Sequence, residues 1–173
     1  MSTFLSRTLI AASLSLGAWT AHAEPTTDDI VGYWRTIDDK TGFAKAVVQI
    51  QKANNGTFVG TIVRTVPRPD YTPAEKCRNC PKPFTDRKII GLPLLWNIKS
   101  DGTTDVNRWR YVEGYAIDPL SGKIYHGKAK VSADGRRLML RGYIGFSALG
   151  RTQIWIREDK NSPLLQDLPP IVP

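Results

Sequence analysis

The stretch "FAKAVVQIQKANNGTFVGTIVR", residues 43–64, carries the pattern that decides the predicted fold. In each half of it, every second residue would point to the same face of an extended strand. The residues that share a face are Ala44, Ala46, Val48 and Ile50 in the first half and Phe58, Gly60 and Ile62 in the second. Asn54, Asn55 and Gly56 separate the halves, and such residues are typical of hairpin turns. The stretch therefore predicts two antiparallel strands.

The same pattern continues along the rest of the chain. Runs of β-branched and aromatic residues are separated at short intervals by Gly, Asn, Asp and Pro, which is typical of strands and turns. Strands are predicted at 31–37, 43–52, 57–64, 94–99, 108–117, 124–132, 137–143 and 152–158. No amphipathic segment is long enough for a crossover helix. The predicted fold class is all-β: an antiparallel up-and-down β-barrel of about eight strands, with a long loop after the third strand.

The interior of such a barrel has two possible states. An eight-stranded barrel either fills its interior with side chains or holds one small ligand. Several residues expected to point inward are Ala or Gly, which favours space, whereas large neighbours would fill the gaps. Both states stay open at this point. The candidate ligand-binding residues of an open barrel are Ala46, Val48, Phe58, Ile62, Tyr125 and Ala129.

Residues 1–23 have the pattern of a secretory signal peptide. Arg7 precedes an apolar run from Leu9 to Ala18, and Ala21-His22-Ala23 matches an A-x-A cleavage site. The run is shorter than the ~18 residues of a membrane-spanning helix, although an uncleaved anchor is an alternative. We expect cleavage to leave one barrel domain, residues 24–158, and a Pro-rich C-terminal tail, residues 159–173. The expected location is the periplasm or the outside of the cell.

The chain is basic, with a formal net charge of +8. Basic segments with aromatic residues, such as "RWRY" at 108–111, would suggest nucleic acid in a cytoplasmic protein. Export argues against a nucleic-acid partner. A basic exterior offers weak attraction to anionic envelope polymers, or it is only a solvated surface.

Two motifs at the ends of the strand series resemble a known family. "VGYWRT" contains Gly32-x-Trp34 on the first predicted strand, and "TQIWIRE" contains Trp155-x-Arg157 on the last. This pairing is similar to that of the lipocalins and their calycin relatives. The resemblance implies that the Arg157 guanidinium stacks on Trp34 and closes one end of the barrel.

A second resemblance covers most of the chain after residue 23. The ordered motifs "IIGLPLLWNIK" (89–99), "YAIDPLSGKIY" (115–125) and "LRGYIGFSALGRTQIWIR" (140–157) resemble an exported bacterial family known as domain of unknown function 2147. That family implies a lipocalin-like barrel and carries no agreed activity or catalytic residues. The pair Cys77 and Cys80 is a departure that the resemblance does not account for.

Cys77 and Cys80 are the only cysteines and have C-x-x-C spacing. A redox site of the thioredoxin type needs a helix after the pair, and here Pro81-Lys82-Pro83 follows. A closed zinc site needs four ligands, which the chain does not offer. A structural disulfide is favoured, with redox chemistry or an intermolecular metal site as alternatives.

The disulfide would stiffen the segment 65–88, which is long for a connection and is predicted to be a lid or binding loop. Within it, Thr72-Pro73-Ala74-Glu75 matches a capping box and predicts one helical turn.

No catalytic set emerges from the sequence. His126 is the only histidine after the predicted cleavage site, and its strand position points it outward. "GFSALG" at 145–150 has one residue too many after Ser147 for a nucleophile elbow. The chain is therefore predicted not to be an enzyme and to need no cofactor or metal.

The sequence predicts an exported protein that binds a small apolar or amphipathic molecule, by analogy of fold. The alternative is a cell-envelope interaction or stress protein whose barrel is packed and whose basic exterior and tail make the contacts. The size of the cavity distinguishes the two.

Overall fold

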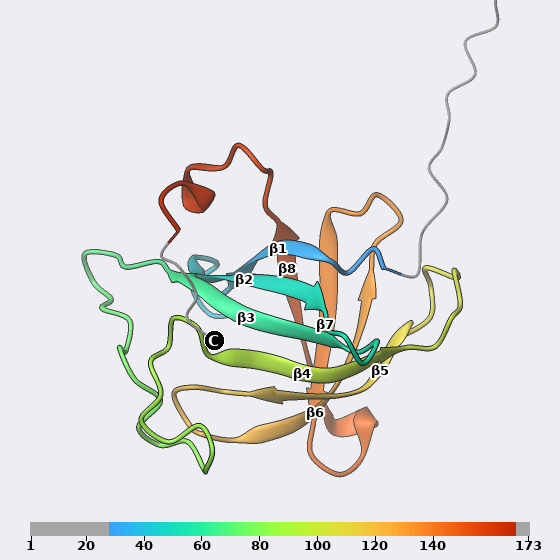
Figure 1. Ribbon diagram of the computed structural model, residues 1–173, viewed down its shortest axis with the longest axis horizontal. Helices are drawn as coiled ribbons and strands as arrows, with labels where there is room; N and C mark the ends of the chain where they lie inside the picture. Colours follow the sequence, from blue (N-terminus) through green and yellow to red (C-terminus); the bar gives the residue numbers. More distant parts are fainter. Residues whose placement is uncertain (1–27, 169–173) are drawn as a thin grey trace, which may run out of the picture.

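Each strand pairs with the next one along the chain, because a turn or loop reverses its direction after every strand. The computed structural model describes residues 28–168, and β1 also pairs with β8, so that the sheet closes into a barrel (Figure 1). The strands are β1 (Gly32–Ile37), β2 (Ala44–Lys52), β3 (Phe58–Thr65), β4 (Pro93–Ser100), β5 (Tyr111–Ile117), β6 (Ile124–Val131), β7 (Arg137–Tyr143) and β8 (Arg151–Arg157).

The predicted fold class is confirmed, with eight antiparallel strands and a long loop after the third. The largest difference in strand bounds is at β5, which begins at Tyr111 instead of 108, because residues 105–108 form a turn closed by the bond from Arg108 N–H to the Asp105 carbonyl. The helical turn predicted at 72–75 is wrong. The Glu75 carbonyl accepts a hydrogen bond from Ile89 N–H across the loop, so this backbone pairs with the other arm of the loop.

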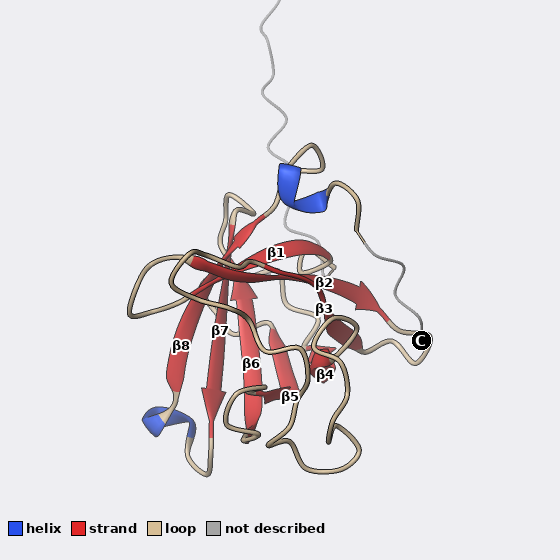
Figure 2. Ribbon diagram, turned by 90° about the vertical axis from the view of Figure 1, so that its left-hand side faces the viewer, coloured by secondary structure: helices blue, strands red, loops and turns tan. Residues whose placement is uncertain are grey.

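The alternating strand directions sort the connections into two ends of the barrel. The end that we call the mouth carries the turns 38–43, 118–123 and 144–150 and the long loop 66–92. The end that we call the closed end carries the turns 53–57, 101–110 and 132–136 and the segment 28–31. Two short helices lie at opposite sides of the molecule (Figure 2): η1 (Ser147–Leu149) at the mouth and η2 (Pro163–Leu165) in the tail after β8.

The side chain of Arg157 seals the closed end. It lies directly across from Trp34 in the pairing of β1 with β8, and its guanidinium carbon is 4.1 Å from the centre of the Trp34 ring. Its three nitrogens donate hydrogen bonds to the carbonyls of Gly135 (2.6 Å), Val31 (2.9 Å) and Asp29. A Cβ at Gly32, whose φ is +135°, would lie 2.7 Å from one of these nitrogens. The glycine of the G-x-W motif therefore makes room for the arginine.

A second buried network anchors segment 28–31 over the same end. Arg110 is 1% exposed and forms an ion pair with Asp29. The Tyr111 hydroxyl donates to the Asp29 carboxylate (2.5 Å) and accepts from Ile30 N–H (3.2 Å). Burial and the bond to Asp29 raise the pKa of Tyr111 well above its usual range. Arg110 and Tyr111 both hold the Asp29 carboxylate, so segment 28–31 is fixed across the closed end and covers it. We call this segment the plug.

Large side chains fill the closed half of the barrel interior. Phe58 and Tyr111 meet edge to face, with ring centres 5.4 Å apart. Trp34, Leu138 and Trp155 are buried beside them. These residues belong to one buried core cluster, and Trp155 lies where this cluster meets the more open half.

The described residues include only part of the two ends of the chain. The predicted signal peptide, residues 1–23, lies outside the described residues. Of the tail, residues 159–168 are described, and the Gln166 carbonyl accepts a hydrogen bond from Arg64 on β3. Within residues 28–168, no helix has the length and apolar character needed to cross a bilayer.

We predict that Arg157→Ala lowers the free energy of unfolding by about 2–4 kcal/mol, because three carbonyls lose their donors and Trp34 loses its cover. Arg157→Lys should restore only part of this, since an ammonium group cannot lie flat on the ring or reach all three acceptors. Denaturant titration measures the effect, with Arg136→Ala, an exposed change at the same end, as control. Equal stability of all four proteins would contradict this role of Arg157.

Candidate functional site

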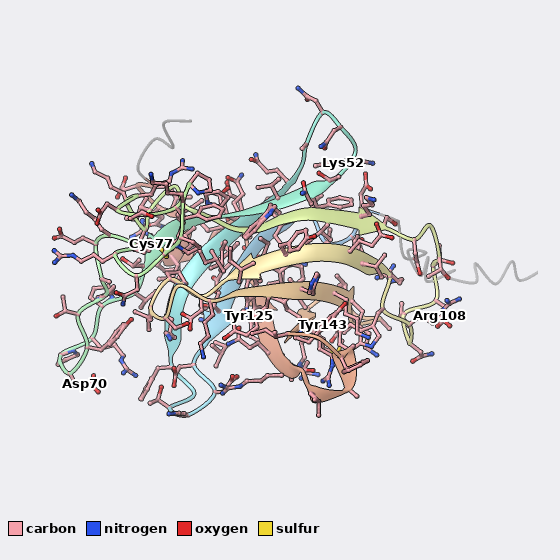
Figure 3. All side chains as sticks on the ribbon, turned by 90° about the horizontal axis from the view of Figure 1, so that it is seen from below. Lys52, Asp70, Cys77, Arg108, Tyr125 and Tyr143 are labelled. Carbon is pink, nitrogen blue, oxygen red and sulfur yellow. A yellow bond between two sulfur atoms is a disulfide. The ribbon has the colours of Figure 1, made fainter. Side chains whose placement is uncertain are left out.

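A cavity of about 500 Å³ opens at the mouth of the barrel. Its inner wall is made mainly of apolar side chains from the strands, namely Ala46, Ile62, Leu95, Ala116, Leu140 and Trp155. Thr36, Tyr125 and Gln153 add polar atoms to this wall. The long loop contributes the outer wall, and Figure 3 shows its residues Asp70 and Cys77 at the end of the molecule opposite Arg108. The site therefore combines an apolar interior with an entrance that carries both ion pairs and exposed apolar side chains.

Small residues create the space in this half of the barrel. Ala46 on β2, Ala116 on β5 and Gly142 on β7 line the cavity, where larger side chains would fill it. The corresponding layer of the closed half holds Trp34 and Phe58, both buried. The interior thus changes from filled to open along the barrel axis.

The six candidate binding residues fall into two groups. Ala46, Ile62 and Tyr125 line the cavity. Their role in ligand contact stays a prediction. Val48, Phe58 and Ala129 do not line it and are at most 1% exposed within the core cluster. Strand alternation predicts which residues point inward, but it does not give their depth along the barrel axis.

Sequence reasoning missed the part of the cavity that comes from the loops. Tyr71, Pro73 and Ala74 of the long loop, Leu120 of the turn 118–123 and Leu149 of η1 all line it. The length of the segment after the third strand was the one available signal, because long connections in compact domains are often functional. Which of its side chains face the cavity depends on how the loop folds back.

Two ion pairs lie at the cavity entrance. Lys45 is 3.5 Å from the Asp38 carboxylate, and Arg151 is 2.7 Å from that of Asp39. Hydrogen bonds from the backbone and side chain of Thr41 lower the pKa of Asp38 to about 2. Asp38 therefore stays charged at any pH above about 2, and the entrance keeps a fixed pattern of both signs.

The predicted disulfide between Cys77 and Cys80 is present, with Cα atoms 5.4 Å apart, and both cysteines are buried. It lies against the turn 118–123, where the Asn79 side chain donates to the Leu120 carbonyl (3.0 Å). A Cβ at Gly122, whose φ is +72°, would lie 1.9 Å from the Asn79 carbonyl oxygen. The disulfide therefore helps to hold one wall of the cavity in place. Among residues 28–168 no group of three or more His, Cys, Asp and Glu side chains is arranged to hold a metal.

A row of aromatic rings crosses the outer face of the barrel, from β4 to β7. Trp96, Tyr115, His126 and Tyr143 are direct neighbours in the strand register, with ring centres 5.2–5.7 Å apart. Phe84 of the long loop extends the row at Trp96, 5.1 Å away. The exposed His126 is thus one ring of a stack and not part of the cavity. A shallow groove of about 730 Å³ runs beside the row.

The bacterial family described as "Uncharacterized protein conserved in bacteria (DUF2147)" matches residues 32–157, from the first residue of β1 to the last of β8. The chain belongs to this family. The match covers the whole barrel, including the long loop and its disulfide. The description of DUF2147 assigns no activity and no site residues.

One solved structure with the same fold is protein HP1028 from the human pathogen Helicobacter pylori, which belongs to the lipocalin family. The two chains are 22% identical and superpose with a TM-score of 0.61, over 75% of this chain and 83% of the other. This likeness shows the lipocalin-like fold of the DUF2147 barrel. No curated protein sequence matches the chain.

We predict that replacing both cysteines, Cys77→Ala with Cys80→Ala, loosens the long loop while the barrel stays folded. A ring this short adds only about 2 kcal/mol, so the melting temperature should fall by about 10 °C or less. Hydrogen exchange should become faster in residues 66–92 and stay unchanged in β6 and β7. Global unfolding of the variant, or an unchanged rate in the loop, would show that the disulfide has a different role.

Proposed function

We propose that this DUF2147 protein is an exported binding protein that holds one small, partly apolar molecule at the mouth of its barrel. The observation that carries the proposal is the cavity of about 500 Å³, a size typical of pockets that enclose small ligands, roughly 300–1,000 Å³. Its mostly apolar wall with a few polar groups is the usual chemistry of such pockets. The alternative function, an interaction protein with a fully packed barrel, agrees with the closed half of the interior but not with the cavity at the mouth.

The arrangement of the wall favours an amphipathic ligand. An apolar body would bury the side chains of Ile62, Leu95 and Leu140, while a polar head would lie at the entrance near Lys45 and Arg151. Arg151 is 66% exposed, so it can contact a ligand without breaking its ion pair with Asp39. Burial of apolar surface would supply most of the affinity, at about 25 cal/mol per Å².

Export is part of the same proposal and is supported by the sequence. The pattern of residues 1–23 is that of a secretory signal peptide. A disulfide between the only two cysteines is compatible with an oxidising compartment such as the periplasm.

Binding is favoured over catalysis by the groups that line the cavity. Asp118 forms hydrogen bonds with Leu120 N–H (3.0 Å) and the Ser121 hydroxyl (2.7 Å), which is the work of a turn residue. Lys45 is paired with Asp38, and His126 lies on the outer face. These groups do not converge on one point as an acid, a base and a nucleophile would.

We predict that Ala46→Phe abolishes uptake of a fluorescent fatty acid, because the ring would occupy the cavity beside Ile62. Ala133→Phe, the same change on an exposed turn at the closed end, should bind like the parent. Ala116→Leu provides a second cavity variant if Ala46→Phe fails to fold. Titration of probe fluorescence measures uptake, and native mass spectrometry of protein from its own host identifies a natural ligand. Equal uptake by parent and both cavity variants would place the probe elsewhere and contradict the proposal.

A second candidate function, contact with anionic envelope polymers, is favoured by the aromatic row on the outer face. The groove beside it is lined by Lys128 and Asn97, by Lys99 in an ion pair with Glu113 (2.6 Å), and by Tyr115 and His126. Aromatic rings bury the apolar faces of sugar rings, and the lysines would attract anionic groups. This function would use the outside of the barrel and needs no ligand inside.

The second candidate predicts that His126→Ser with Lys128→Ser reduces retention of the protein on isolated peptidoglycan by roughly tenfold, since two contacts are lost. Both residues lie on the barrel surface, so the fold should survive the change. Lys160→Ser, which removes one exposed charge from the tail, should have little effect. Retention that is equal for all variants would exclude the groove as the contact surface.

A further inference from the structure

The turn 144–150 places large apolar side chains in water at the mouth. Ile144 is 63% exposed, Phe146 80% and Leu149 85%. Other turns at this end add Phe43 and Leu120, which are also exposed. Soluble surfaces normally scatter exposed apolar residues singly, and a group of them at one end indicates a contact surface.

The turn is held rigidly in this position. The Arg141 guanidinium donates hydrogen bonds to the carbonyls of Ser147 (2.8 Å) and Ala148 (2.9 Å). Residue Gly145 takes a φ of +72°, which other residues rarely adopt. Phe146 and Leu149 are thus presented by a preformed turn. Burying these two side chains in a binding partner would therefore cost little conformational entropy of the backbone.

The charges of the connections differ between the two ends. The mouth connections, 38–43, 66–92, 118–123 and 144–150, contain eight Lys and Arg against six Asp and Glu. The closed-end segments, 28–31, 53–57, 101–110 and 132–136, contain three against five. The connections at the mouth are therefore net positive, and they include the turn with the exposed apolar tips.

A lipid bilayer of negative charge fits both features at once. Basic groups near such a surface contribute about 1 kcal/mol each, and apolar tips contribute by entering the acyl boundary. A protein partner would need a continuous complementary patch, whereas here the apolar side chains stand on separate turns around an opening. Ile144 and Leu149 also line the cavity, so the apolar path is continuous from the tips to the interior.

We propose that the mouth docks on an anionic lipid bilayer through Phe146 and Leu149, so that an amphipathic ligand passes between the membrane and the cavity without crossing water. The docking surface is defined by the structure independently of any ligand. The passage of a ligand rests on the function proposed above.

The test uses the fact that both cysteines are in the disulfide, so a single added cysteine can be labelled. An environment-sensitive fluorophore is placed at Phe146→Cys, and at Ile154→Cys as control, because Ile154 is 48% exposed on the outer face of β8. Vesicles of phosphatidylethanolamine and phosphatidylglycerol should shift the emission of the first label to the blue and leave the second unchanged. Vesicles of phosphatidylcholine alone, or added salt, should weaken the response.

An unlabelled pair of variants measures the affinity. Phe146→Ser should weaken vesicle flotation about tenfold or more, since one large apolar side chain no longer enters the bilayer, while Ile154→Ser should float like the parent. Phe146 does not line the cavity, so uptake of the fluorescent fatty acid without vesicles should be unchanged in Phe146→Ser.

The outcomes separate this inference from the function proposed above. Fatty-acid uptake without any vesicle binding would overturn the docking and leave the binding function standing. Vesicle binding through Phe146 without fatty-acid uptake would support docking and overturn the binding function. Equal emission shifts at both label positions would show binding by another surface and overturn the docking.

Discussion

Arg157 is the point at which the barrel is closed, and the rest of the structure depends on it. The seam between β1 and β8 has only two residue pairs, fewer than any other pair of neighbouring strands. The guanidinium adds to this seam by stacking on Trp34 and by bonding to three carbonyls from the turn 132–136 and the segment 28–31. A barrel with this seam open would expose two strand edges, and closure removes both.

Sealing one end decides where the cavity of the barrel lies. Segment 28–31, held by Arg110 and Tyr111, covers the closed end, and the rings of Trp34 and Phe58 fill the interior below it. The remaining space therefore lies at the mouth. The long loop then forms the outer wall of that space, and the disulfide holds it against the turn 118–123. The closing contacts and the cavity of the proposed binding function thus lie in opposite halves of one small barrel.

The mouth combines three properties that have one physical explanation. It opens into an apolar cavity, it carries apolar side chains on rigid turns, and its connections are more positive than those of the other end. Any one of these would be unremarkable on a protein surface. Together they are the features expected of the proposed docking on an anionic membrane. The aromatic row lies on the outer face of the barrel, and its Tyr143 also lines the cavity.

The sequence by itself determined the strands, their order and the closure of the barrel. Those features depend on local alternation, on turn residues and on short connections, which can be read without knowing any distant contact. It also marked Trp34 and Arg157, through the resemblance of their motifs to those of the lipocalins. It marked Cys77 and Cys80 because they are the only two cysteines in the sequence. Only the tertiary structure decided the rest. Whether Val48 lines a cavity or lies in the core depends on its depth along the barrel axis, and alternation does not encode depth. Contacts between segments far apart in the chain decide three further features, and no local pattern specifies such contacts. These features are the loop side chains at the cavity, the aromatic row around His126 and the exposure of Phe146.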